Sequence, residues 1–75
     1  MHNPSDFHDI NLELHGEHSL YIENFKKLSK YTMEEITIQT AKGNLLITGS
    51  SLYIKKYTKE EIFIEGLITN IIRLS

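Results

Sequence analysis

Four histidines in the first quarter of the chain are the residues with the clearest capacity for chemistry. They are His2, His8, His15 and His18. The stretch HGEH places two imidazoles three residues apart, and with Glu13 or Glu17 they could supply part of a divalent-metal site. However, Gly16 breaks a helix that would put both rings on one face, and no other cluster supplies further ligands. Solvated turn histidines are therefore favoured, no metal or other cofactor is predicted, and a hydrolase built around His15 or His18 is kept as a third alternative.

Two acidic pairs and a serine pair are the other groups to weigh for catalysis. Hydrolysis by two carboxylates needs acids that face each other across a bond, but the neighbours Glu34-Glu35 and Glu60-Glu61 would point to opposite faces of a strand. Ser50-Ser51 lacks the GxSxG context and an activating acid and histidine. Cysteine is absent, which excludes thiol catalysis and disulfides. We predict no catalytic residue and expect that the protein is not an enzyme.

A repeat shows which elements would position these side chains. YTMEEITIQT at residues 31–40 returns as YTKEEIFIEG at residues 57–66, an offset of 26 residues. Each copy is predicted to form a strand, a tight turn containing Thr-x-Glu-Glu, and a second strand. Thr32 and Thr58 are expected to bond to local backbone, while the four glutamates at the bends remain solvated.

Apolar residues alternate with polar ones over most of the chain, which is the period-two pattern of half-buried strands. The stretch at residues 22–32 could also suit a short helix, but its alignment with the second copy of the repeat favours a strand. We predict an all-β fold, a small antiparallel β-sandwich or roll of about seven or eight short strands with a 26-residue internal repeat. Gly43 suits the left-handed position of a short hairpin. The predicted structural turns contain Gly16, Gly43, Gly49 and Gly66.

Composition limits the domain organisation and the partners. Residues 1–9 are rich in turn formers and are expected to be a flexible N-terminal tail, followed by a single domain at residues 10–75. A domain this small buries only roughly 60 to 65% of the surface of its unfolded chain, so packing against another copy would help, and a homo-oligomer is expected. A net charge of −2 argues against nucleic acid as a partner. No apolar run is long enough for a membrane span, and no signal peptide is seen.

Three aromatic residues fall on the side of their strands opposite the isoleucines and leucines. Tyr21 and Tyr53 each lie in LYI, and Phe63 lies in IFI. Such an apolar stripe is typical of a contact surface, although the second layer of a sandwich would bury it equally well, and both interpretations stay open. Lys55 and Lys56 follow in the same segment as Tyr53. The candidate interaction surface is therefore Tyr21, Tyr53, Phe63, Lys55 and Lys56.

The spacing of glycines and strand residues resembles that of a known family. The stretches that carry it are LHGEHSLYIENFKKL and EITIQTAKGNLLITGSSLYIKKYTKEEIFIEGLITNI, over roughly residues 10–74. They resemble the YabP/YqfC family of sporulation proteins, and its YqfC branch in particular. The resemblance implies a protein made in the mother cell of an endospore-forming bacterium and linked to assembly of the spore envelope, the cortex or coat. It carries over the turn glycines and the segment at residues 22–24 as architecture and implies no catalytic residues.

The leading hypothesis is a non-enzymatic β-domain that works by association. Exposed strand edges and the aromatic stripe would contact a second copy or other spore-envelope assembly proteins. The expected location is the mother-cell cytoplasm, at the forespore surface. The alternative is a small module that binds an envelope glycan or an anionic ligand through its lysine and tyrosine surface.

Overall fold

The computed structural model of the chain describes residues 10–74, which form strands and no helix. The strands are β1 (Asn11–His15), β2 (Ser19–Glu23), β3 (Lys27–Tyr31), β4 (Glu35–Thr40), β5 (Gly43–Tyr57) and β6 (Glu61–Leu74). The predicted tail at residues 1–9 lies outside the described residues. Within residues 10–74 no helix is long and apolar enough to cross a membrane.

The six strands form one sheet in the order β1-β2-β6-β5-β4-β3, and every neighbouring pair is antiparallel. The predicted all-β antiparallel class is confirmed. The ambiguous stretch at residues 22–32 contains the end of β2 and all of β3, as the strand interpretation predicted.

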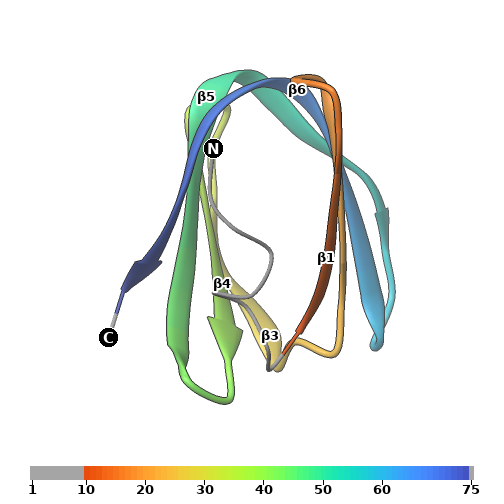
Figure 1. Cartoon of the computed structure of the whole chain (residues 1–75), viewed down its shortest axis with the longest axis vertical. Coiled ribbons are helices and arrows are strands. Elements are labelled where there is room, and N and C mark those ends of the chain that lie inside the picture. The colour runs from red at the N-terminus through yellow and green to blue at the C-terminus, as the bar shows by residue number, and fades with distance from the viewer. Residues whose placement is uncertain (1–9, 75) are drawn as a thin grey trace.

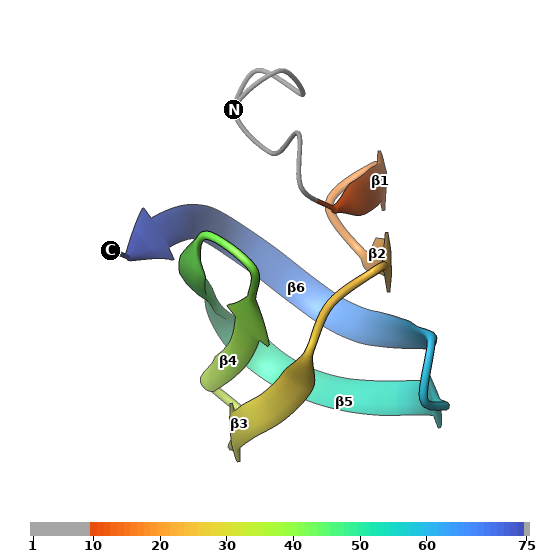
Figure 2. The ribbon, with the colours of Figure 1, turned by 90° about the horizontal axis from the view of Figure 1, so that it is seen from below.

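Two long strands, β5 and β6, carry the sheet from one layer into a second that faces it (Figures 1 and 2). β4 pairs with β5 at residues 43–48, so one layer holds β3, β4, the first half of β5 and the second half of β6. β2 pairs with β6 at residues 61–65, so the other holds β1, β2, the first half of β6 and the second half of β5. A single bent sheet thus encloses the core between its two halves.

The continuity of β5 and β6 corrects the predicted strand count of seven or eight. Gly49 and Gly66 were predicted to lie in turns, but both lie inside strands, and the segments that follow them are the second halves of β5 and β6. Gly49 and Gly66 mark bends within these strands, where register shifts let both strands turn together and stay paired. Ser51 and Gly66 have positive φ values of 53° and 129° at this bend. Glycine interrupts the side-chain pattern there without ending the backbone ladder, which is why the local pattern suggested two extra strands.

The core lies on the inner face of both layers. It contains the apolar residues that alternate with polar ones along the strands, and the two halves of the sheet enclose them. Leu12, Leu14, Leu28 and Ile54 are partly buried and pack against its margin. The fully buried side chains are Leu20, Ile22, Ile36, Ile38, Leu45, Ile47, Leu52, Ile62 and Ile64.

Both copies of the Thr-x-Glu-Glu sequence form the same turn. The amide of Thr32 donates to the carbonyl of Glu35 at 2.8 Å, and the amide of Thr58 donates to the carbonyl of Glu61 at 2.8 Å. Each threonine Oγ1 also accepts from the next two glutamate amides. The predicted local bonding by the two threonines is confirmed.

Gly16 lies in a turn, and Gly43 is the strand residue that closes the next hairpin. Gly16, with φ at 66°, lies in the β1–β2 turn. Gly43, with φ at 119°, begins β5 directly after the two-residue β4–β5 loop and pairs with Thr40. The buried Thr40 hydroxyl donates to the carbonyl of Gly43 at 2.8 Å and accepts from Arg73 at 2.6 Å. These bonds fix the end of the β4–β5 hairpin.

Candidate interaction surface

The five residues predicted to form an interaction surface lie together on the outer face of the β1–β2 layer. Tyr21 lies between the buried Leu20 and Ile22 on β2, so its ring points away from the core. The other four come from the second half of β5 and the first half of β6. We call Tyr21, Tyr53, Phe63, Lys55 and Lys56 the aromatic face.

Register places the members of the aromatic face next to one another across three strands. Phe63 is paired with Tyr21 of β2 on one side and with Lys56 of β5 on the other. The Tyr21 and Phe63 rings meet edge to face with centroids 6.1 Å apart, a favourable arrangement for two aromatic quadrupoles. Tyr53 stands opposite Glu65 in the next row and is 47% exposed. The rings are therefore on the surface of the described structure, which decides against the alternative that they form the second layer of the core.

A bulge brings both lysines onto the same face. Ile54 pairs with Ile64 and Lys56 pairs with Phe63, so Lys55 is an extra residue in β5. The Lys55 ammonium lies 5.8 Å from the centroid of the Phe63 ring and 3.3 Å from Oε2 of Glu65. Without the bulge, strict alternation would send two consecutive lysines to opposite sides of the sheet.

Two glutamates of β6 hold the polar groups of the aromatic face. Glu61 accepts a 2.6 Å hydrogen bond from the Tyr21 hydroxyl and forms a 2.6 Å ion pair with Lys56. Glu65 accepts a hydrogen bond from the Tyr53 hydroxyl and forms its ion pair with Lys55. Each tyrosine ring is therefore tethered at its outer end, and each lysine charge is balanced by an adjacent carboxylate.

On the aromatic face the pKa values of the two tyrosines are raised and those of the two glutamates are lowered. Hydrogen bonds to Glu61 and to Glu65 raise the pKa values of Tyr21 and Tyr53, because the carboxylate favours the protonated phenol. The pKa of Glu61 is lowered first by the hydrogen bond from Lys56 and then by that from Tyr21, while the pKa of Glu65 is lowered chiefly by the bond from Tyr53. These contacts therefore stabilise the protonated form of each tyrosine and the ionised form of each glutamate.

A sequence model of the YabP family matches residues 7–73, which is most of the chain. The chain belongs to the YabP family. The uncharacterized protein YqfC of Bacillus subtilis (strain 168) is 34% identical over 53 residues, which cover 71% of this chain and 57% of YqfC. The chain thus matches little more than half the length of that relative. The predicted membership of the YabP/YqfC family is confirmed, and the family is related to sporulation.

For this YabP-family domain, sequence reasoning missed the two glutamates that organise the aromatic face. Glu61 was expected to be solvated at a bend and Glu65 was not singled out, yet both are half-buried between the aromatic and lysine side chains. The signal was present in the spacing, because Glu61, Phe63 and Glu65 alternate on β6 and must share one face. Pairing of β6 with both β2 and β5, which makes the contacts, could not be read from that spacing.

The other residues first considered for chemistry lie apart from the aromatic face. His15 ends β1 beside Glu13, with Nε2 and Oε1 3.3 Å apart, and His18 is exposed in the β1–β2 turn. Among residues 10–74 no three histidine or carboxylate side chains are close enough to hold a metal ion. His2 and His8 lie outside the described residues.

The lowered pKa values of Glu61 and Glu65 predict that acid destabilises this YabP-family domain. A folded-state pKa below the unfolded value of 4.5 means that unfolding takes up protons, so the stabilisation is full above that value and is lost as the pH falls through the folded pKa values. We expect the urea midpoint to fall as the pH drops below the unfolded value of 4.5, and to fall less steeply in a Glu61→Gln, Glu65→Gln variant. Glu34→Gln on the exposed β3–β4 turn is the control, and equal slopes for the double variant and the wild type would contradict the prediction.

Proposed function

We propose that this YabP-family domain acts without catalysis in assembly of the spore envelope, the cortex or coat. Its aromatic face would make non-covalent contact with a second copy or with another envelope-assembly protein. The proposed place of action is the mother-cell cytoplasm, at the forespore surface. The match to the YabP family over residues 7–73 supports the sporulation role, and the aromatic face supports contact as the mechanism.

The observation that carries this proposal is that the aromatic rings are held in place before any partner arrives. Tyr21 and Tyr53 are tethered through their hydroxyls, and Phe63 lies between Tyr21 and the Lys55 ammonium. Aromatic side chains are enriched in protein interfaces because they offer a large contact area with few rotatable bonds. A partner that docks on pre-ordered rings loses less side-chain entropy on binding. An ordered aromatic group on an exposed sheet face is therefore well suited to recognition of a protein.

Charge balance favours a protein over the alternative, an envelope glycan or anionic ligand. An anion approaching Lys55 or Lys56 would have to compete with Glu65 and Glu61, which lie at 3.3 Å and 2.6 Å from the two ammonium groups. A Lys55→Glu, Lys56→Glu variant separates the two possibilities. Saturable binding of anionic lipids or envelope glycans that this variant loses would support the alternative, whereas flat titrations would remove it.

We test the proposed function with Tyr53→Glu, which places a carboxylate beside Glu65 at the most exposed ring of the face. Position 53 is on the surface, so the domain should fold. Tyrosine is enriched among the hot spots of interfaces, where truncation costs at least about 2 kcal/mol of binding, or roughly 30-fold in affinity, and we expect the number of heat-resistant spores to fall at least about tenfold. Met33→Glu, on the β3–β4 turn at a residue that is 65% exposed, is the matched control. A folded Tyr53→Glu protein that supports normal sporulation would overturn the proposal.

A further inference from the structure

The outer face of the layer that holds β3 and β4 lies on the opposite side of the molecule from the aromatic face. The core lies between the two layers, so their outer faces point away from each other (Figure 2). Leu46 lies between the buried Leu45 and Ile47 on β5, so its side chain points outward. Cross-strand register extends this outer face to β3, β4 and β6. We call Lys27, Lys30, Thr37, Leu46, Ile72 and Leu74 the aliphatic face.

The apolar side chains of the aliphatic face lie together on β5 and β6. Leu46 and Ile72 are paired directly across the two strands, and both are half-buried. Leu74 lies in the next row of the same face and is 40% exposed. Neighbouring exposed apolar side chains are typical of a contact surface. The aliphatic face can therefore offer an apolar area to a partner.

The β3 side of the aliphatic face is positively charged. Lys27 and Lys30 are both exposed on β3. Lys30 forms a 2.7 Å ion pair with Glu35 of β4, whereas Lys27 forms no ion pair with any of residues 10–74. Two lysines and one glutamate leave the strands on this side with an excess positive charge.

The strands beside the aromatic face have the opposite charge. Glu13 and Glu23 lie on the same outer face, on β1 and β2. Glu13 lies 3.3 Å from Nε2 of His15, and Glu23 accepts a 2.7 Å hydrogen bond from the side-chain amide of Asn11. The two lysines of the aromatic face are paired with the glutamates of β6 and do not compensate these carboxylates. β1 and β2 therefore carry an excess negative charge next to the rings.

One row of paired residues crosses each outer face in a matching order. On the aliphatic face the row from β3 to β6 is Lys30, Thr37, Leu46 and Ile72. On the aromatic face the row from β1 to β5 is Glu13, Tyr21, Phe63 and Lys56. Each row begins with an exposed charge and has an apolar side chain at its third position, and the two charges have opposite signs. The two faces are therefore complementary in charge and in the position of their apolar groups.

We propose that copies of this chain stack head to tail, with the aliphatic face of one copy packed on the aromatic face of the next. With β3 over β1, Lys30 lies opposite Glu13, and Leu46 lies against the Phe63 ring. Sheets that pack face to face lie about 10 Å apart with their side chains interdigitated. Because the two contacting faces differ, each contact leaves one unused face at either end. The stack therefore grows into an open chain of copies or closes into a ring.

This stacking deepens the proposed function by naming a second copy as the partner of the aromatic face. It rests on that function in taking the aromatic face as a contact surface. A two-fold contact between like faces would end at a dimer, whereas a head-to-tail contact adds copies without limit. Growth of this kind is what assembly of an envelope layer requires.

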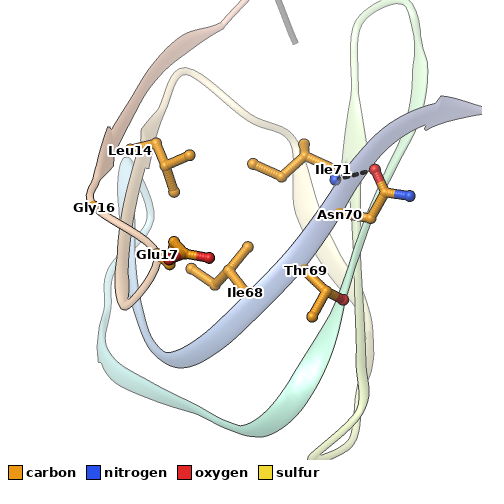
Figure 3. A pocket seen from close by; sticks show the side chains of 7 residues that line it. All are labelled: Leu14, Gly16, Glu17, Ile68, Thr69, Asn70 and Ile71. Carbon is orange, nitrogen blue, oxygen red and sulfur yellow. Dashed lines mark hydrogen bonds between the residues drawn. The ribbon is translucent and has the colours of Figure 1, made fainter. Parts of the chain in front are cut away.

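A cavity of about 230 Å³ between the β1–β2 turn and β6 lies apart from both outer faces (Figure 3). Leu14, Ile68 and Ile71 supply its apolar walls. Ile68 and Ile71 are buried, and Leu14 packs against the core, so the cavity opens on the side of the bent sheet, between its layers. Stacking through the outer faces therefore leaves this cavity uncovered.

The test is the mass of the purified full chain by sedimentation across a concentration series, with Lys30→Glu beside Glu13→Lys. Each substitution places two like charges at the contact of positions 13 and 30, so each variant alone should associate at least about tenfold more weakly than the wild type. An equimolar mixture of the two variants restores opposite charges at every contact, because the unaltered faces fit each other and so do the altered ones. We expect the mixture to associate as the wild type does.

Lys59→Glu and Glu34→Lys are the matched controls. They make the same two changes of net charge on the β5–β6 and β3–β4 turns, outside both faces. All four substituted positions are exposed, so all four variants should fold. Each control alone is expected to associate as the wild type does. Equal weakening of association in the controls and in the face variants would overturn the proposal, because the total charge and not the two faces would then be responsible.

The masses also distinguish head-to-tail stacking from other contacts. Species larger than a dimer that grow with concentration support the proposal, whereas a mass that stops at a dimer, or no recovery in the mixture, overturns it. A wild type that is monomeric at every concentration, together with a loss of spores in Tyr53→Glu, would overturn the stacking and leave the proposed function in place, with a different protein on the aromatic face. Stacking that Tyr53→Glu abolishes without loss of spores would support the stacking and overturn the proposed function.

Discussion

Alanine at position 49 is expected to remove a large part of the stability of the domain. A Cβ at Gly49 would lie 1.9 Å from the carbonyl oxygen of Leu67 and 3.0 Å from its carbonyl carbon. These atoms are backbone of the paired strand, so relief requires the β5 and β6 strands to separate at the bend. Overpacking of a rigid site lowers the free energy of unfolding by about 1 to 3 kcal/mol. Because the obstruction here is backbone, we expect Gly49→Ala to cost at least the upper value of this range. A chain of this length has only about 4 to 11 kcal/mol in total.

Gly16 provides the matched control for this substitution. It lies in the β1–β2 turn with a positive φ, whereas Gly49 lies within β5, and no atom lies within 4 Å of the position that a Cβ would take at Gly16. Gly16→Ala should therefore cost only the left-handed backbone penalty of about 1 to 2 kcal/mol. Urea unfolding followed by circular dichroism compares the two variants directly. Equal losses of stability would mean that the approach of the strands at Gly49 is not what requires glycine there.

Local alternation predicted the core of this fold well because each strand has one buried face. The inward assignment of Leu20, Ile22, Ile36 and Ile38 follows from period two alone, since a slip of one residue would expose all of them. The class of the fold and its antiparallel pairing follow from the same pattern and from connections too short for a crossover. These are properties of the local sequence.

The shape of the sheet depends on contacts between residues far apart in the chain. In the sequence, Gly49 and Gly66 interrupt the alternation of apolar and polar residues in the same way as the end of a strand would. Only the pairing of β5 with β6 on both sides of the bend shows that the two strands continue. The bulge at Lys55 is also set by its partner strand, since the extra residue is defined only against Ile64 and Phe63. A sequence shows where alternation fails, and the fold decides whether the failure is a turn, a bend or a bulge.

The sequence was sufficient to predict that the three aromatic residues share one face, but not to predict the ion pairs that surround them. Tyr21, Tyr53 and Phe63 share a parity opposite to the core residues around them, which is visible in LYI and IFI. The balance of Lys55 and Lys56 by Glu65 and Glu61 requires cross-strand register. This difference matters for function, because an uncompensated pair of lysines would favour anions, whereas the paired arrangement presents rings with little net charge.

Phe63→Asp and Ile64→Asp are adjacent substitutions with opposite expected results. Ile64 is fully buried between Leu20 of β2 and Ile54 of β5. An unpaired carboxylate there lacks any compensating charge, and its burial costs several kcal/mol even after relaxation. We expect Ile64→Asp to be unfolded at neutral pH, since the whole domain has only about 4 to 11 kcal/mol to lose.

Phe63→Asp is expected to fold and to lose association through the aromatic face. The new carboxylate would be half-exposed beside Lys55 and Lys56, so it can be hydrated and paired, and the loss of the contact with Tyr21 should cost only about 0.5 to 1.5 kcal/mol beyond the buried area of the ring. A charge in the centre of the aromatic group would have to be desolvated by any apolar partner surface. Circular dichroism reports folding, and heat-resistant spore counts report function. An unfolded Phe63→Asp would show that the ring is required by the core, and a folded variant with normal sporulation would show that contact on this face is not what the domain contributes.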